Sequence, residues 1–483
     1  MKSPRLSFLL VLCAILILTA CSGKSTNVEA DRGDGSSSGE GKPKVLRVLY
    51  ATVEAGSEAI IAAANKYESE TGIDIEVDTF PYNNLQEKLF SELAQKSDYY
   101  DVFAVDTPWV PTIIQHLEPL SEYMRNTKSP DRLKLDDFIA KAFLDTSVFK
   151  LDKPHENPPQ MDVIDLDKIN SEEFDVWSLP IQSNVLTVSY RKDLFENAEF
   201  REQFKQEYGR ELDIPQTLDE YLEVAKFFTR DMDNDGNIDL YGTTLMARKH
   251  EANFVDFKSF LSNFGGSIFD ENLKPIFNNE VGVKALETYG SWINEHKVTP
   301  PGVLTYTWDE VATVFGSGQV AMGMNYHDMK LDPKVEGGKT GYFVFPGVEN
   351  NGNIVRGPHF GSWGVGINKY SKNKQAAYEL VEYLTSPDVQ IEYLNFNQHV
   401  TRISAYEASA NFENEQTREY YQVLGESLNI GVGRPRITNY DQVSEVVQIA
   451  VSEYLFNKKS AKEALDEAAM QVEKLMEQAG YYQ

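Results

Sequence analysis

The pattern that decides the fold begins at residues 45–80, which read VLRVLYATVEAGSEAIIAAANKYESETGIDIEVDTF. Residues 45–50 form an apolar run with the character of a strand, and residues 56–71 place apolar side chains at helical spacing. Residues 73–80 then alternate apolar and polar positions, as a half-buried strand does. Strands that alternate with helices predict a parallel or mixed sheet covered by helices on both faces.

The alternation continues along the chain. Region 128–173 interrupts it with four prolines and many acidic residues, so we expect an insertion there. The remaining predicted elements are a strand over 101–105, regular structure that resumes over 176–190, and helices over 83–95, 109–117, 135–144, 218–230, 281–296, 308–316, 374–385, 442–456 and 461–479.

The N-terminal residues read as targeting sequence. Residues 1–20 hold basic residues followed by an apolar run that is shorter than the roughly 20 residues needed to span a bilayer, which predicts a signal peptide. Its end, Leu18-Thr19-Ala20-Cys21, resembles the bacterial lipoprotein processing site, which implies a lipidated Cys21. Residues 21–44 are rich in Gly, Ser and charge and predict a flexible linker. The alternative is an ordinary signal peptide that contains a cysteine.

Composition narrows the classes of function. The formal net charge of −28 argues against a nucleic acid partner. The only cysteines, Cys13 and Cys21, fall in the predicted signal and at its cleavage site, so the rest of the chain has no disulfide or thiolate metal site. A chain of 483 residues is too long for a single core and should form two or more domains.

Seven phrases resemble, in order and spacing, the family 1 extracellular solute-binding proteins of the maltose-binding-protein type, which include lipoproteins of bacterial sugar ABC importers. They are YDVFAVD at 100–106, SLPI at 178–181, VSYRKDLF at 188–195, PQTLDEY at 215–221, FGSGQVAM at 315–322, GVGIN at 364–368 and TSPDV at 385–389.

This resemblance implies an α/β, two-lobed periplasmic-binding-protein fold of type II, with an interlobe cleft and a hinge. By matching segments, the N-lobe would comprise 44–183 plus 363–401, and the C-lobe 184–362 plus 402–483. The insertion 128–173 has no counterpart in the simplest members. The implied function is capture of a carbohydrate, we expect an oligosaccharide, and its delivery to the permease of an ABC importer. We expect a monomer without a catalytic cofactor, lipid-anchored on a Gram-positive surface or facing a periplasm.

A sugar ligand needs flat aromatic faces for its ring and planar amides or carboxylates for its hydroxyl groups. Asp106 and Trp109 follow a predicted strand, and ligands of open α/β sheets collect at the carboxyl ends of strands. For any one of these aromatics, core packing is the competing interpretation. The predicted ligand-binding residues are Tyr82, Asp106, Trp109, Gln182, Trp308, Asn325, Tyr326, Trp363 and Tyr440.

The stretch DMDNDGNID at 231–239 is the sharpest local motif. Gly236 permits a tight turn, and Gly242 stands where an EF-hand would supply its glutamate, so the motif resembles a nine-residue calcium loop rather than an EF-hand. A solvated acidic turn is the alternative. The predicted ligands of a structural calcium ion are Asp231, Asp233, Asp235, Asn237 and Asp239.

Other functions use the same cleft. A secreted glycosidase would need two carboxylates roughly 5–10 Å apart, which an acidic chain can supply by chance. The sequence holds no nucleophile elbow, phosphate loop or HExxH motif, and we expect no enzyme. A polyamine or other cation could lie between Asp106 and the aromatics. A sensor that presents its ligand to a membrane receptor is a further possibility.

Overall fold

The computed structural model describes residues 43–52, 56–326 and 329–482. The predicted signal peptide, Cys21 and all but the end of the predicted linker lie outside the described residues. None of the helices described is both long enough and apolar enough to cross a membrane.

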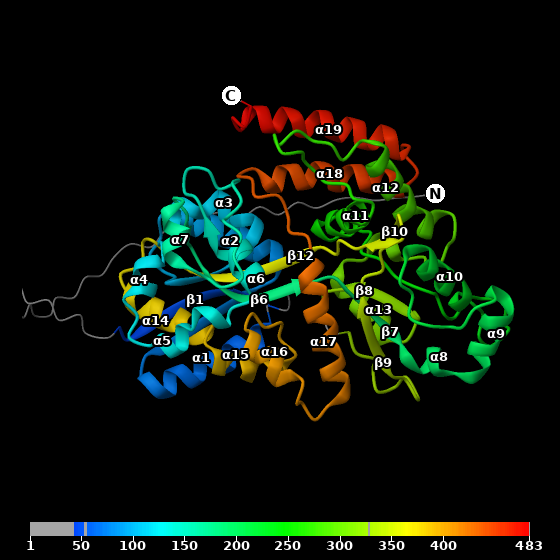
Figure 1. Cartoon of the computed structure of the whole chain (residues 1–483), viewed down its shortest axis with the longest axis horizontal. Helices are drawn as coiled ribbons and strands as arrows, with labels where there is room; N and C mark the ends of the chain where they lie inside the picture. Colours follow the sequence, from blue (N-terminus) through cyan, green and yellow to red (C-terminus); the bar gives the residue numbers. More distant parts are fainter. Residues whose placement is uncertain (1–42, 53–55, 327–328, 483) are drawn as a thin grey trace, which may run out of the picture. The chain divides into compact units, whose positions relative to one another are not determined.

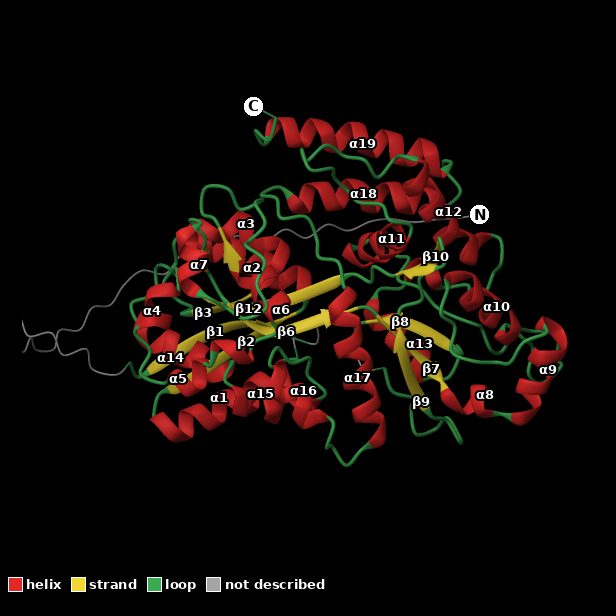
Figure 2. Cartoon of the chain, viewed as in Figure 1, coloured by secondary structure: helices red, strands yellow, loops and turns green. Residues whose placement is uncertain are grey.

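The first lobe is built on a five-stranded sheet in the order β2-β1-β3-β12-β6. Strand β1 runs parallel to β2 and β3, whereas β12 runs antiparallel to β3 and β6. Every residue of β3, β6 and β12 is buried, which matches a sheet covered on both faces, and Figure 2 shows helices on both sides of it. The strands are β1 Val45–Ala51, β2 Asp74–Phe80, β3 Val102–Asp106, β6 Leu179–Val185 and β12 Phe360–Ile367.

Apolar spacing predicted three helices of this lobe, Ser57–Thr71, Tyr82–Ala94 and Lys374–Leu384, but not Ser121–Arg125 or Pro387–Tyr393. The predicted helix over 109–117 is instead a short α-helix between two 3-10 turns, Thr107–Trp109 and Ile114–His116. The helices are α1 Ser57–Thr71, α2 Tyr82–Ala94, α3 Val110–Ile113, α4 Ser121–Arg125, α14 Lys374–Leu384 and α15 Pro387–Tyr393.

The insertion carries more structure than the single predicted helix. The buried Arg402 side chain donates hydrogen bonds to the carbonyls of Leu133, Lys134 and Thr385 at 2.8–2.9 Å, and so holds the end of α5 against the first lobe. No local pattern encodes such a tertiary contact. The elements are α5 Pro130–Leu133, α6 Ala140–Ser147, β4 Val148–Phe149, α7 Leu166–Ser171 and β5 Asp175–Val176.

The second lobe is built on the sheet β8-β7-β9 with a separate β10-β11 hairpin. Figure 1 shows β7, β8 and β9 on the opposite side of the view from β1, β6 and β12. Its strands are β7 Thr187–Arg191, β8 Met322–Asn325, β9 Thr340–Val344, β10 Val348–Asn350 and β11 Asn353–Val355. Its helices are α8 Lys192–Glu196, α9 Ala198–Tyr208, α10 Leu218–Phe228, α11 Glu251–Asn263, α12 Glu280–Asn294, α13 Trp308–Gly316, α18 Tyr440–Leu455 and α19 Ala461–Gln478.

Two further helices, α16 Ile403–Ser409 and α17 Glu415–Ile430, lie along the junction of the lobes. Helix α17 contacts β6 of the first sheet and β7 and β9 of the second, and Figure 1 shows it running between the two. Helices α11 and α17 were both missed by sequence reasoning. Helix α11 is buried nearly all round and includes buried polar residues, so its sequence lacks the amphipathic stripe of a surface helix.

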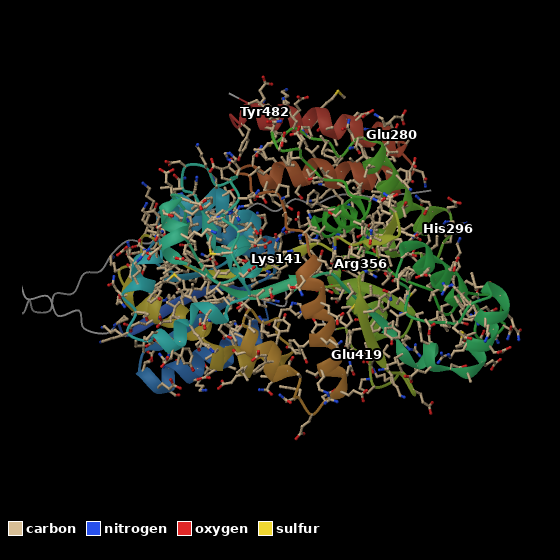
Figure 3. The ribbon with its side chains drawn as sticks, viewed as in Figure 1. Lys141, Glu280, His296, Arg356, Glu419 and Tyr482 are labelled. Carbon is tan, nitrogen blue, oxygen red and sulfur yellow. The ribbon has the colours of Figure 1, made fainter. Side chains whose placement is uncertain are left out.

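Three chain segments cross side by side at the hinge. The Leu186 N–H donates to the His359 carbonyl at 3.0 Å, and the Phe360 N–H donates to the Val432 carbonyl at 3.0 Å. The third segment, residues 431–437, is called the strap below. Lys141 of α6 donates to the Gly431 carbonyl, and Figure 3 shows Lys141 near the middle of the molecule. These bonds join the three crossing segments side by side, and the three together are called the hinge ribbon below.

Candidate functional site

A cavity lies between the lobes, next to the hinge ribbon. Its apolar walls come from four aromatic side chains, two from each lobe. They are Tyr82 and Trp363 from the first lobe and Trp308 and Tyr326 from the second.

Strand pairing fixes one wall. Trp363 of β12 lies opposite Asp106 of β3 on one side and Gln182 of β6 on the other, at an irregularity between Trp363 and Gly364. The Thr107 hydroxyl donates to the Ser362 carbonyl at 2.8 Å and anchors the turn after β3. The site therefore lies at the carboxyl end of β3, where open α/β sheets bind ligands.

The aromatic rings pack edge to face. The Tyr82 ring lies 6.0 Å from Trp363 and 5.9 Å from Trp308, centroid to centroid, both in T-shaped arrangements. Trp109 lies behind this layer, fully buried, 5.1 Å from Tyr82 and 5.4 Å from Trp363. Trp109 thus supports the wall without lining the cavity.

A charged network joins the two lobes across the cavity. Arg434 of the strap forms ion pairs with Asp106 of the first lobe and, at 3.3 Å, with Glu251 of the second. The Tyr82 hydroxyl donates to the other Asp106 oxygen at 2.7 Å. Both Asp106 oxygens are therefore engaged by side chains of the chain itself.

Glu251 is the first residue of α11 and accepts hydrogen bonds from α18. The Ser444 hydroxyl donates to it at 2.5 Å and the Gln448 amide at 3.4 Å, and the Tyr440 hydroxyl donates to its other oxygen. Burial raises the pKa of Glu251, and the opposing charge of Arg434 and these donors act against that rise.

His359, at the hinge, completes the polar wall. Its Nδ1 lies 2.9 Å from the Tyr326 hydroxyl, and its backbone N–H donates to Ser259 Oγ at 2.9 Å. Burial, and then the charges of Arg434 and Lys258, lower the pKa of His359, so the imidazole is neutral at pH 7.

Five of the nine predicted ligand residues come together at the cavity: Tyr82, Asp106, Trp308, Tyr326 and Trp363. The other four lie around it. Trp109 and Gln182 are behind the first-lobe wall, the Asn325 amide donates to the Trp308 carbonyl at 2.8 Å, and Tyr440 bonds Glu251. None of these four lines the cavity, and whether any of the nine binds ligand stays a prediction.

Sequence reasoning missed three polar residues of the cavity wall, Glu251, His359 and Arg434. Glu251 and His359 follow no motif. Arg434 offered a weak signal, because GVGRPRI at 431–437 places two arginines among glycine, proline and apolar residues in an acidic chain.

A second, more polar cavity of about 660 Å³ shares Tyr82 and Glu251 with the first. Asn83 and Gln86 of α2 line one side, and Asp441 of α18 lines another. Since the two cavities adjoin, the cleft has an aromatic part and a polar part.

The acidic loop lies away from both cavities and is exposed. Oxygens of Asp231, Asp233 and Asp239 lie within 4.8 Å of one another, close enough to share a cation. The same loop satisfies itself in part, since Asp231 accepts the backbone N–H groups of Asn234 and Gly236 at 2.6 and 2.7 Å. These bonds, that from Gly236 foremost, lower the pKa of Asp231.

Comparison with known proteins gives a consistent picture. The family model for bacterial extracellular solute-binding proteins matches residues 50–391. A probable amino-acid ABC transporter periplasmic-binding protein from Sinorhizobium fredii is 24% identical over 444 residues, 90% of each chain.

Solved structures show the same fold. Maltose-bound MalE3 from T. maritima superimposes with a TM-score of 0.69 at 23% identity, over 89% of this chain and 99% of that one. An ABC transporter solute-binding protein from Agrobacterium radiobacter K84 in complex with ribitol gives 0.70 at 22% identity, over 90% and 100%. These similarities establish the two-lobed α/β fold with its cleft and hinge.

Proposed function

This chain belongs to the bacterial extracellular solute-binding protein family, and from that premise we propose that it binds a carbohydrate in its interlobe cavity and delivers it to the permease of an ABC importer. It is a substrate-binding protein of an ABC transporter, not an enzyme. The carbohydrate, its length and the route of delivery are the proposed part.

The observation that carries this proposal is the combination of aromatic and polar groups around one cavity. Tyr82, Trp308 and Trp363 give the cavity an aromatic wall for a pyranose ring, and Glu251 and His359 line the same cavity and can bind hydroxyl groups. The adjoining polar cavity extends the cleft beyond the aromatic walls, which favours an oligosaccharide. The solved relatives with bound maltose and ribitol support the same class of ligand.

Two other ligand classes remain candidates. The name of the Sinorhizobium relative suggests an amino acid, and the acidic surface suggests a polyamine. A free cation is less favoured, because Arg434 and Tyr82 already engage both oxygens of Asp106. An amino acid does not account for the aromatic walls as simply as a sugar does.

A thermal-shift screen separates these classes. The protein without residues 1–44 is heated with maltose, ribitol, D-glucose, putrescine and L-glutamate, each in turn. A ligand at 100 times its dissociation constant adds about 2.7 kcal/mol to the free energy of unfolding, which raises the melting temperature measurably. Stabilisation by a sugar or polyol alone is the expected result. Stabilisation by putrescine or L-glutamate alone would replace the carbohydrate with that class.

The proposal includes a lipid anchor at Cys21 on the outer face of the cell membrane, with the protein acting as a monomer. Its support is Leu18-Thr19-Ala20-Cys21 at the end of an apolar run. In cells grown with labelled palmitate, the wild-type protein should carry label and Cys21→Ser should not. Equal labelling of both would refute lipidation at this residue.

We also propose that the acidic loop binds calcium in a structural role. The three converging carboxylates of Asp231, Asp233 and Asp239 support it, with Asp235 and the Asn237 carbonyl as further predicted ligands. Calcium titration by calorimetry should show one site that Asp233→Asn weakens. No heat of binding at millimolar calcium would leave the loop as a solvated turn.

A further inference from the structure

Two buried polar atoms of residues that line the cavity lack a hydrogen-bond partner within the described residues. They are Nε of Arg434 and Nε2 of His359, whose residues are only 9% and 3% exposed. Leaving a buried polar atom unpaired costs free energy, and native proteins rarely do so without a reason. For residues that line a ligand cavity, a bound ligand can supply the missing partner.

We propose that Arg434 Nε and His359 Nε2 bind hydroxyl oxygens of an uncharged polyhydroxy ligand, and that this pair makes the cavity select neutral sugars and polyols over amino acids and sugar acids. The inference rests on the proposed function and adds the recognition residues and the charge of the ligand.

Only an uncharged group of the ligand can bind to Arg434 here. Its terminal nitrogens are shared by Asp106 and Glu251, so two carboxylates already surround one guanidinium. A third carboxylate, from an amino acid or a sugar acid, would be repelled by both. The N–H at Nε has no partner within the described residues and can only donate, and a hydroxyl or ring oxygen is an acceptor of the right charge.

His359 adds a partner that suits a hydroxyl group in either orientation. Its Nδ1 is engaged by the Tyr326 hydroxyl at 2.9 Å, which fixes the ring and leaves Nε2 as the free nitrogen. The neutral ring presents Nε2 as either donor or acceptor, according to the tautomer. A hydroxyl group both donates and accepts, so it satisfies Nε2 in both cases.

The aromatic walls complete the recognition. Trp308 and Trp363 line the same cavity as these two atoms, so hydroxyl groups can meet Arg434 and His359 while carbon–hydrogen faces lie against indole rings. A linear polyol or a sugar ring has both kinds of surface, whereas free amino acids and polyamines lack the hydroxyl groups.

A matched pair of histidine variants tests the assignment. In His359→Asn the amide takes the place of Nδ1 and can keep the Tyr326 contact, but nothing replaces Nε2. In His359→Gln the amide reaches the position of Nε2. Titration calorimetry with D-glucose, D-xylose, maltose and ribitol first identifies the probes that bind the wild type. His359→Asn should bind each of these probes about tenfold more weakly. His359→Gln should stay within about threefold.

The charged probes are D-glucuronate, L-glutamate and putrescine, and none should bind the wild type. Circular dichroism checks that each variant is folded. If His359→Asn does not fold, Arg434→Lys provides the second test, because lysine keeps a cation near Asp106 but has no Nε, and the same tenfold loss is expected.

The outcomes separate this inference from the proposed function. If the wild type binds none of the neutral probes, the proposed function fails and the inference falls with it. If the wild type binds a sugar or polyol and the folded His359→Asn or Arg434→Lys variant binds it equally tightly, only the inference fails. Tight binding of L-glutamate or D-glucuronate would overturn the claim of neutral selectivity.

Discussion

At the scale of single residues, the site depends on side chains whose roles differ although their types are the same. Trp308 lines the cavity and lies 4.7 Å from His250, ring to ring. Trp177 is equally buried, but its indole N–H donates to the Phe149 carbonyl at 2.9 Å, away from the cavity. The pair therefore separates loss of an indole from loss of a ligand contact.

We predict that Trp308→Ala weakens carbohydrate binding by about tenfold or more, because the sugar ring loses the indole against which it packs. Trp177→Ala should cost about 3–5 kcal/mol of stability and leave the affinity unchanged below its melting temperature. Calorimetric titration at 15 °C measures both. Equal losses of affinity in the two variants would remove Trp308 from the site.

Asp256 of α11 gives a prediction on pH. It is fully buried, accepts the Met246 N–H at 2.9 Å, and burial raises its pKa to about 8. A carboxyl group whose pKa is raised on folding contributes stability at low pH that is lost as the pH rises from its unfolded pKa, about 4, to about 8.

Asp256→Asn should remove this loss, because an amide does not ionise. Urea unfolding at pH 5, 7 and 8.5 measures the free energy of unfolding of both proteins. The value for the variant should rise relative to the wild type as the pH rises, by on the order of a few kcal/mol over the range. A stability difference that is the same at all three pH values would mean that Asp256 does not titrate in this window.

At the scale of elements, the sequence predicted the helices that have a clear apolar spacing of their own. Helices α13 and α19 begin with capping boxes at Thr307 and Ser460, and apolar spacing placed both closely. Helix α11 was not predicted, because it is buried on nearly every face and so lacks an amphipathic pattern. The same limit applies to the site: aromatics at strand ends were predictable, whereas Arg434 and Glu251 become partners only through contacts between residues about 180 positions apart.

Two glycines, Gly425 inside α17 and Gly431 just after it, make a matched test of the hinge. Gly431 adopts φ −62°, which suits any residue, but a Cβ there would lie 2.8 Å from the Phe360 Cβ. Gly425 lies inside α17, where a Cβ would meet the Tyr406 ring at an ordinary 3.5 Å. The first is therefore restricted by packing between hinge segments and the second is not.

We predict that Gly431→Ala destabilises the protein by about 1–3 kcal/mol through overpacking of the hinge ribbon. Gly425→Ala should stabilise it by about 0.5–1 kcal/mol, because alanine favours a helix interior. Urea unfolding gives both values. A Gly431→Ala variant as stable as the wild type would show that the crossings are not closely packed.

At the scale of the whole molecule, the fold of the solute-binding family places the cavity between two lobes. Three adjacent crossings make a hinge that lets two lobes close on a ligand, and Arg434 contacts both lobes at the cavity. Binding, rather than conversion, of a neutral sugar is the central claim.

Native mass spectrometry of the protein with an equimolar mixture of maltose, ribitol, D-glucose, putrescine and L-glutamate tests this claim most directly. The account predicts a monomer that carries one sugar or polyol, released with its mass unchanged. A complex with putrescine or L-glutamate, a cleaved sugar, or no complex at all at ligand concentrations up to 1 mM would contradict it.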